Sequence, residues 1–226
     1  MKTQTKELLD QIIGLSDERK IKIYLKQGIK EKILGVNLGP LRKLAEEHGI
    51  DPETADELWE TGIYEARVVA SMLVDPKAMS ITKMERYLRQ TQSRMVVDEL
   101  TLDVFDEVKD KQEWMDRWIH HEDLVLRRAG WNMAIVMILR HKNDPVWLQS
   151  LVEYIEANLV DADGFIQDAM NRALCEIGIR YDEFTQRCLS IGERLGVYRD
   201  MKVSKGCTSP YAPDWINVVR KKKHKK

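Results

Sequence analysis

Asp98 is the residue whose type and position most suggest chemistry. It lies within a predicted helix over Met95–Asp106. At about 100° per residue, the other acidic side chains of that helix form a solvent stripe, whereas Asp98 falls between Leu102 and Phe105. A carboxylate among large apolar groups loses hydration and needs a partner. It is therefore either a structural group bonded to an arginine or a helix cap, or a catalytic acid, base or electrostatic stabiliser.

A second candidate set consists of arginines on predicted helices. Arg94 precedes Asp98 by one helical turn, a spacing at which the two side chains can pair. Two adjacent arginines cannot both face the same side of one helix. Each arginine could form an ordinary ion pair, but together they could line a phosphate-binding groove. The set is Arg67, Arg94, Arg127, Arg128 and Arg172.

No metal or cofactor site is indicated. His120 and His121 are adjacent and diverge by about 100° on a helix, with no suitably spaced third ligand. The sequence has neither a Gly-rich phosphate loop nor a G-x-S-x-G elbow. The tryptophans occur among Leu, Val and Ile at helical spacing, which favours core packing over base stacking. Three scattered cysteines without a C-x-x-C pair are typical of reduced thiols: Cys175, Cys188 and Cys207.

The elements that must position these side chains are helices. Asp51-Pro52 and Asp144-Pro145 are typical of an N-cap followed by a proline in the first turn, and Ser80 is a predicted cap. No convincing alternating strand occurs, so we expect an all-α fold. The predicted helices include Leu41–His48, Pro52–Trp59, Ile81–Arg89, Met95–Asp106, Pro145–Asn158, Phe165–Ile177 and Asp182–Leu195.

Three helical segments resemble one another and indicate a repeat. They are Glu65–Ala70, Arg128–Ala134 and Asp168–Ala173, each with small alanines about one turn apart. With Met95–Asp106 between the first two, successive centres are roughly 30 to 40 residues apart, which is the spacing of two-helix solenoid repeats. We expect a solenoid; an irregular helical domain is the alternative. Because no linker rich in Gly, Ser or Pro divides the chain, residues 1–219 are expected to form one domain.

Composition excludes several classes of protein. The 226 residues include 36 Lys and Arg against 37 Asp and Glu, so the chain is not a globally basic nucleic-acid binder. The longest apolar run, Met133–Leu139, is far shorter than the ~20 residues that span a bilayer. We expect a soluble cytoplasmic protein. Residues 220–226 are expected to form a disordered basic tail, which either holds nucleic acid non-specifically or is a solvated end.

Several motifs resemble the DNA alkylation repair family, the AlkD-like HEAT-repeat proteins, of which this chain would be a divergent member. The similarity extends from about Gly28 to Trp215. It is carried by LWETGIYEAR at Leu58–Arg67 with Ala70-Ser71-Met72, LRRAG at Leu126–Gly130, and NRAL at Asn171–Leu174. The ending GCTSPYAPDWI at Gly206–Ile216 resembles one bacterial branch. A bacterial, nucleoid-associated location follows from that resemblance.

The resemblance implies a superhelix of HEAT-like antiparallel helix pairs with a basic concave surface that cradles double-stranded DNA. Family enzymes hydrolyse the N-glycosidic bond of N3- and N7-alkylated purines, using two tryptophans and one aspartate at the lesion. The alkylated base is cationic and leaves easily, so the enzyme needs mainly a carboxylate near the sugar, and no cofactor. Neither a membrane nor a small-molecule cofactor is an expected partner.

Carried over residue by residue, the family's aspartate falls on Asp98. Arg94 stands where the first tryptophan is expected, and Arg172 stands at the second. A tryptophan face attracts a cationic base by on the order of 0.5–2 kcal/mol, whereas an arginine repels it. Arginine does bind phosphate well. The replacements therefore weaken the case for alkylpurine excision more than the case for DNA binding.

Three functional hypotheses follow. The first is a homologue that binds duplex DNA and acts as an alkylpurine DNA glycosylase through Asp98, with the arginines on phosphates. The second is a non-catalytic DNA-binding paralogue that recognises distorted or branched DNA. The third is a helical scaffold that binds a protein or peptide. Salt-dependent DNA binding would separate the first two from the third, whereas an acidic groove would favour the scaffold.

Overall fold

The computed structural model describes residues 1–26, 28–140, 144–204 and 206–223, and these are mostly helical. No strand occurs in this described part, where Lys32 and Ile63 form one isolated parallel bridge. The all-α prediction is confirmed. The helices are α1 (Thr3–Gly14), α2 (Glu18–Lys26), α3 (Leu38–His48), α4 (Pro52–Glu60), α5 (Tyr64–Leu73), α6 (Ile81–Arg89), α7 (Arg94–Glu107), α8 (Lys111–Trp118), α9 (Leu124–Arg140), α10 (Pro145–Asn158), α11 (Gln167–Arg180), α12 (Asp182–Leu195) and α13 (Ala212–Lys223), with a 3₁₀ turn at Pro76–Ala78.

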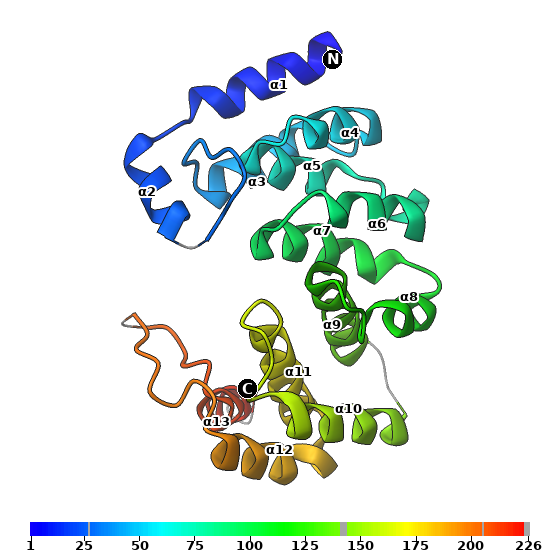
Figure 1. Cartoon of the computed structure of the whole chain (residues 1–226), viewed down its shortest axis with the longest axis vertical. Helices are drawn as coiled ribbons and strands as arrows, with labels where there is room; N and C mark the ends of the chain where they lie inside the picture. Colours follow the sequence, from blue (N-terminus) through cyan, green and yellow to red (C-terminus); the bar gives the residue numbers. More distant parts are fainter. Residues whose placement is uncertain (27, 141–143, 205, 224–226) are drawn as a thin grey trace.

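The helices stack into a solenoid of two layers (Figure 1). An inner row consists of α3, α5, α7, α9, α11 and α13, each packed against the next. Outer helices cover this row: α4 packs on α5, α8 on α9, and α12 on both α11 and α13. The three similar sequence segments lie in α5, α9 and α11, all in the inner row. The predicted superhelix of HEAT-like repeats is thus confirmed.

Side-chain caps fix where several helices begin. The Asp51 carboxylate accepts a hydrogen bond from the Thr54 amide at 3.1 Å, and Pro52 follows it at the start of α4. Asp144 does the same for α10 through the Val146 amide at 3.0 Å. These caps satisfy amide groups that have no partner within the helix. The helix starts predicted from Asp-Pro are confirmed.

The central helix α9 is buried on all sides, which explains its almost uninterrupted apolar sequence. Gly130 lets α8 approach it closely. A Cβ at that position would lie 2.5 Å from the Cα of Ile119 and 2.6 Å from the carbonyl carbon of Trp118. Trp59, Trp118 and Trp131 are fully buried, as core packing predicts.

The chain end differs from expectation. The basic tail was predicted to be disordered from Arg220, but α13 continues through Lys223. Arg220 donates to the Ile179 carbonyl at 3.2 Å and to an Asp182 carboxylate oxygen at 2.7 Å, so it belongs to the packed body. Residues 224–226 lie outside the described part. Within the described ranges, no helix is both long and apolar enough to cross a bilayer.

Candidate nucleic-acid interface

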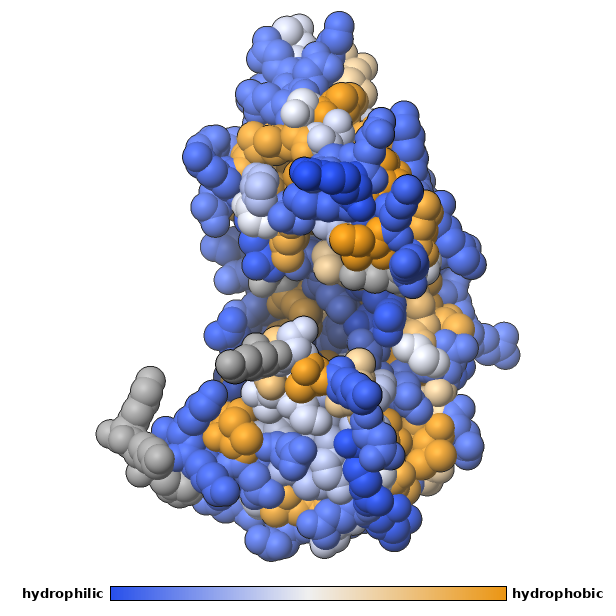
Figure 2. All heavy atoms as spheres, turned by 90° about the vertical axis from the view of Figure 1, so that its left-hand side faces the viewer, coloured by the Kyte–Doolittle hydropathy of each residue, from blue (hydrophilic) through white to orange (hydrophobic). Residues whose placement is uncertain are grey.

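A cleft of about 1010 Å³ opens on one side of the solenoid, where Figure 2 shows a hollow between its upper and lower parts. Its walls come from the first turns of α7, from residues 163–168 ahead of and within α11, and from Gly28 and Ile29 after α2. Tyr198, in the loop between α12 and α13, completes the lining. The cleft therefore gathers residues that are up to 170 positions apart in sequence.

Asp98 lies in the cleft wall, with 30% of its side chain exposed, and is paired with Arg128 from α9. The pair is bidentate: Nε of Arg128 lies 2.8 Å from Oδ1 of Asp98, and Nη2 lies 2.6 Å from Oδ2. Asn132, one turn further along α9, donates to the same Oδ1 at 2.8 Å. Both carboxylate oxygens thus have donors, and the position between apolar neighbours is satisfied by hydrogen bonds.

Arg128 also binds α11. Its Nη1 donates at 2.6 Å both to an Asp168 carboxylate oxygen and to the Phe165 carbonyl. The guanidinium, only 4% exposed, also lies 5.7 Å above the Phe165 ring. Arg128 therefore joins α7, α9 and α11 at one point in the inner row.

The electrostatics of this cluster are balanced. Burial by itself lowers the pKa of Arg128, but the hydrogen bonds that it donates to Asp98 and then to Asp168 outweigh burial and raise this pKa above its ordinary value. Arg94 adds a second cation, with Nη1 at 3.8 Å from Asp168. Two guanidinium groups thus face two carboxylates, and the cluster carries no net charge.

The predicted arginines do not form one groove. Arg94, at the start of α7, donates to the Gly164 carbonyl at 3.2 Å and pairs with Asp168 rather than with Asp98. Arg94 and Asp98 both line the cleft, but the ion pair that their spacing suggested does not form, because Arg94 pairs with Asp168. Arg128 faces the cleft while its neighbour Arg127 donates to the His121 carbonyl at 2.6 Å, as expected for adjacent helix positions.

Arg67 and Arg172 lie away from the cleft lining. Arg67 is 8% exposed and donates to the carbonyls of Trp59 at 3.2 Å and Gln90 at 2.7 Å. This buried guanidinium therefore joins the last turn of α4 to the residue that ends α6 and has no face for a phosphate. Arg172, on α11, is half-buried and forms no ion pair with another residue of the described chain.

The cleft lining is acidic rather than basic. Among the described residues it holds two arginines and four carboxylates, namely Arg94, Arg128, Asp98, Glu99, Asp163 and Asp168. Exposed basic side chains gather at its two edges instead. One edge is α2 and the residues after it, and the other is the loop between α12 and α13, which projects on the same side (Figure 1). The first edge bears Arg19, Lys22, Lys26, Lys30 and Lys32, and the second Arg199 and Lys202. The lining thus departs from the basic concave surface that the family resemblance implied.

Several residues of this cluster were not singled out by sequence reasoning. Asp168 on α11 binds Arg128, and Asn132 on α9 binds Asp98. The one sequence signal that could have indicated these contacts is that each pair is separated by about one repeat. Phe165 and Tyr198 bring aromatic rings to the cleft, although the expected tryptophan positions hold arginine. Tyr198 lies in an irregular loop, where no periodicity reports on its orientation.

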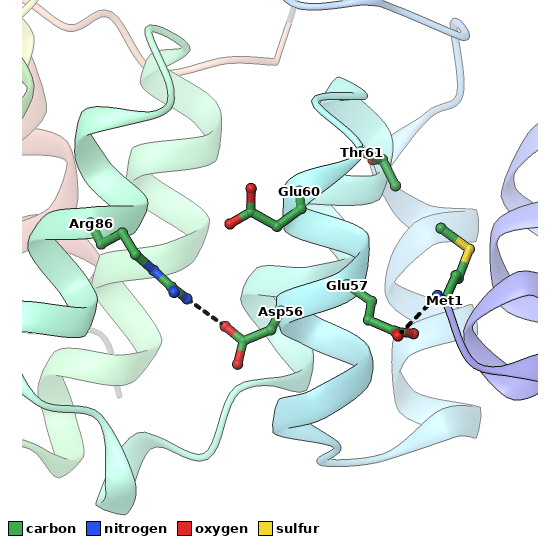
Figure 3. A pocket seen from close by; sticks show the side chains of 6 residues that line it. All are labelled: Met1, Asp56, Glu57, Glu60, Thr61 and Arg86. Carbon is green, nitrogen blue, oxygen red and sulfur yellow. Dashed lines mark hydrogen bonds and ion pairs between the residues drawn. The ribbon is translucent and has the colours of Figure 1, made fainter.

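A separate hollow of about 470 Å³ lies between α4 and α6 (Figure 3). Its acidic side chains face cations from neighbouring elements: Arg86 contacts Asp56 at 2.8 Å, and the amino group of Met1 contacts Glu57 at 3.4 Å. These contacts are those of a seam between helices. Within the described ranges, no group of three or more His, Cys, Asp or Glu side chains is placed to hold a metal ion.

Fold and cluster together define a HEAT-like helical-repeat protein with an aspartate–arginine centre in its cleft. The family model for the DNA alkylation repair enzyme matches residues 6–216. The chain therefore belongs to the DNA alkylation repair enzyme family.

A solved structure supports the same assignment. It is described as "A new family of proteins related to the HEAT-like repeat DNA glycosylases with affinity for branched DNA structures". It is 25% identical, with a TM-score of 0.81, and the match covers 97% of this chain and 94% of that one. Comparison with curated proteins finds no significant match.

Proposed function

We propose that this protein binds DNA at branched or distorted sites and does not excise alkylated purines. The observation that carries the proposal is the neutralised Asp98. Its charge is matched by Arg128, and the whole cluster with Asp168 and Arg94 is balanced. The affinity for branched DNA that is described for the similar structure supports the DNA-binding part.

A glycosylase needs from this carboxylate a negative field at the sugar and a lone pair for water. A carboxylate has about four acceptor positions. In Asp98, Arg128 takes two of them and Asn132 takes a third. The bidentate guanidinium also cancels most of the field. Arg94 and Arg172 occupy the positions where the family resemblance implies tryptophan. These positions therefore offer a cationic base no aromatic face, and Asp98 offers it no unpaired carboxylate.

The two basic edges of the cleft are the surfaces best suited to bind DNA phosphates. The lining offers a DNA backbone no excess of positive charge, because its two arginines are matched by the carboxylates of Asp98 and Asp168. Phosphates at the edges would instead meet Lys22, Lys30 or Lys202. A straight duplex presents one continuous backbone surface. A junction presents backbones that diverge around an open centre, which suits two separated basic edges around an acidic lining.

Fluorescence anisotropy with a four-way junction and a matched duplex tests the proposal. We expect tighter binding to the junction, with the logarithm of the binding constant falling linearly with the logarithm of salt concentration. Lys22→Ala/Lys30→Ala should weaken binding and reduce that slope by about 2. The matched control is Lys109→Ala, an exposed lysine in the loop between α7 and α8 on the other side of the molecule (Figure 1). Equal binding of junction and duplex would contradict the proposal.

The acidic lining favours one alternative, a scaffold for a basic protein segment. Asp98 and Asp168 are balanced by the cluster's two arginines, and Glu99 is paired with Arg42 at 2.9 Å. Asp163 forms no ion pair with another described residue, so it is the carboxylate of the cleft that would attract a lysine or arginine of such a partner. The same fluorescence anisotropy experiment distinguishes DNA binding from the scaffold function. A scaffold would bind neither DNA form, and the lysine substitutions at the edges would have no effect on DNA.

A further inference from the structure

Tyr198 has an unusual backbone conformation. Its φ of 65° is in the left-handed region, and it is the only non-glycine residue with positive φ in the described part of the chain. Aromatic side chains are disfavoured there, and residues held in this region cluster at ligand-binding and active sites. This conformation therefore calls for an explanation in terms of what the side chain does.

The surrounding turn holds Tyr198 in place. The Arg199 amide donates to the Gly196 carbonyl at 3.1 Å, which makes Tyr198 the third residue of a four-residue turn. Glycine or asparagine is preferred at such a position when φ is positive. The Met201 amide bonds the Tyr198 carbonyl at 3.1 Å, and the Arg199 side chain donates to the Glu193 carbonyl. The turn thus presents a tyrosine where a glycine would be less strained.

The Tyr198 side chain lines the cleft beside the charged cluster. Burial raises the pKa of its hydroxyl, as does nearby Asp168, while Arg94 and Arg128 oppose this, so the phenol stays neutral. Among the described residues, its hydroxyl forms no hydrogen bond and its ring pairs with no other ring. No contact of these kinds inside the protein accounts for the strained placement.

Among the described residues, the aromatic rings that line the cleft are those of Phe165 and Tyr198, and they differ in their contact with cations. Arg128 lies 5.7 Å above the Phe165 ring, whereas no cation lies over Tyr198 in the described structure. Arg94, 48% exposed, is a nearby guanidinium that could contact a phosphate. An aromatic ring next to an exposed arginine is the combination with which proteins hold an unstacked nucleotide.

We propose that Tyr198 stacks on a nucleobase that is unpaired at the centre of a DNA branch, with Arg94 on the adjoining phosphate. This inference rests on the proposed DNA-binding function and identifies the feature of branched DNA that is recognised. Base stacking on an aromatic residue tolerates any sequence, because every base has a π-face. The left-handed conformation of Tyr198 holds the ring in the cleft before DNA arrives, which reduces the entropy lost on binding.

The test uses the full chain and a four-way junction with 2-aminopurine at the branch point, whose fluorescence falls when it stacks on an aromatic ring. Tyr198→Phe should keep both affinity and fluorescence loss. Tyr198→Leu and Tyr198→Gly should bind the junction roughly 5- to 150-fold more weakly, abolish the fluorescence loss, and leave duplex affinity unchanged. Met201→Ala, an exposed apolar side chain in the same loop, is the matched control.

The glycine variant is the control for a possible folding defect. Since glycine accepts positive φ without strain, Tyr198→Gly should keep its thermal unfolding midpoint within about 3 °C of the native protein. Junction binding and fluorescence loss that persist in Tyr198→Leu would overturn the stacking proposal and leave the DNA-binding function intact. An equal loss on junction and duplex would also overturn it. A native protein that binds no junction at all would overturn both.

Discussion

Arg128 binds Asp98 through two parallel hydrogen bonds of 2.8 and 2.6 Å, and this pair joins α9 to α7 at the cleft wall. The Asp98 position, isolated on its helical wheel, left open whether the carboxylate was structural or catalytic. The contact gives it a structural partner from the neighbouring inner helix. It also explains why an arginine that is only 4% exposed remains charged.

Removing this guanidinium should destabilise the fold. Arg128→Met leaves Asp98 and Asp168 without their main partner, and we expect the free energy of unfolding to fall by about 2–3 kcal/mol, since both carboxylates are partly exposed. Urea denaturation measures this change in the free energy of unfolding. Arg127→Met is the matched control on the same helix, because among the described residues Arg127 donates to the His121 carbonyl alone, and its effect should be within about 1 kcal/mol. Equal effects of the two variants would contradict the structural role of the pair.

Base excision can be tested directly. The native protein and Asp98→Asn should both fail to release N7-methylguanine or N3-methyladenine from duplex DNA, because the Asp98 charge is already balanced. Chromatography of released base is the measurement. Release by the native protein that disappears in Asp98→Asn would establish a glycosylase and refute the proposed non-catalytic function.

Acid should remove the contribution of the α4 cap. Hydrogen bonds from the Thr54 hydroxyl and amide, and then from His48, lower the pKa of Asp51 to about 2. Because the unfolded chain binds this proton more readily, the stabilisation is complete above about pH 4 and is lost as pH falls towards 2. Asp51→Ala should cost about 1 kcal/mol at pH 7 and almost nothing at pH 2.

The control for that cap is Ser80→Ala on α6. The Ser80 hydroxyl caps the helix through the Lys83 amide at 3.2 Å and does not titrate. Its loss should reduce the free energy of unfolding by a similar amount at both pH values. A cost of Asp51→Ala that stays constant with pH would show that its charge contributes nothing.

Close packing of α8 on α9 predicts the most damaging small substitution. Gly130→Ala would place a methyl group 2.5 Å from the Cα of Ile119, against backbone that cannot rotate away, and should cost about 3 kcal/mol or more. Gly14→Ala, at the end of α1 with open space where its Cβ would lie, should be neutral or stabilise by up to about 1 kcal/mol. Thermal unfolding of the two variants gives the comparison. Similar midpoints would contradict the close approach.

The sequence by itself determined most of the local structure. Caps such as Asp51 and Ser80 act through hydrogen bonds within three residues, so their signals are complete in the sequence. The three similar segments with alanines about one turn apart predicted a helical repeat, because their spacing along the chain is that of two-helix solenoid units. Motifs along the chain also indicated the family that the comparisons confirm.

Only the tertiary structure decided the partners of each charge. The i, i+4 spacing suggested that Arg94 would pair with Asp98, but the partner of Asp98 is Arg128, thirty residues away. Arg94 instead contacts the Gly164 carbonyl and the Asp168 carboxylate. Whether an arginine faces DNA or a buried carbonyl, as Arg67 does, depends on the packing of neighbouring repeats. Ion pairs between repeats and the orientation of a loop residue such as Tyr198 are set by contacts distant in sequence, which no local pattern encodes.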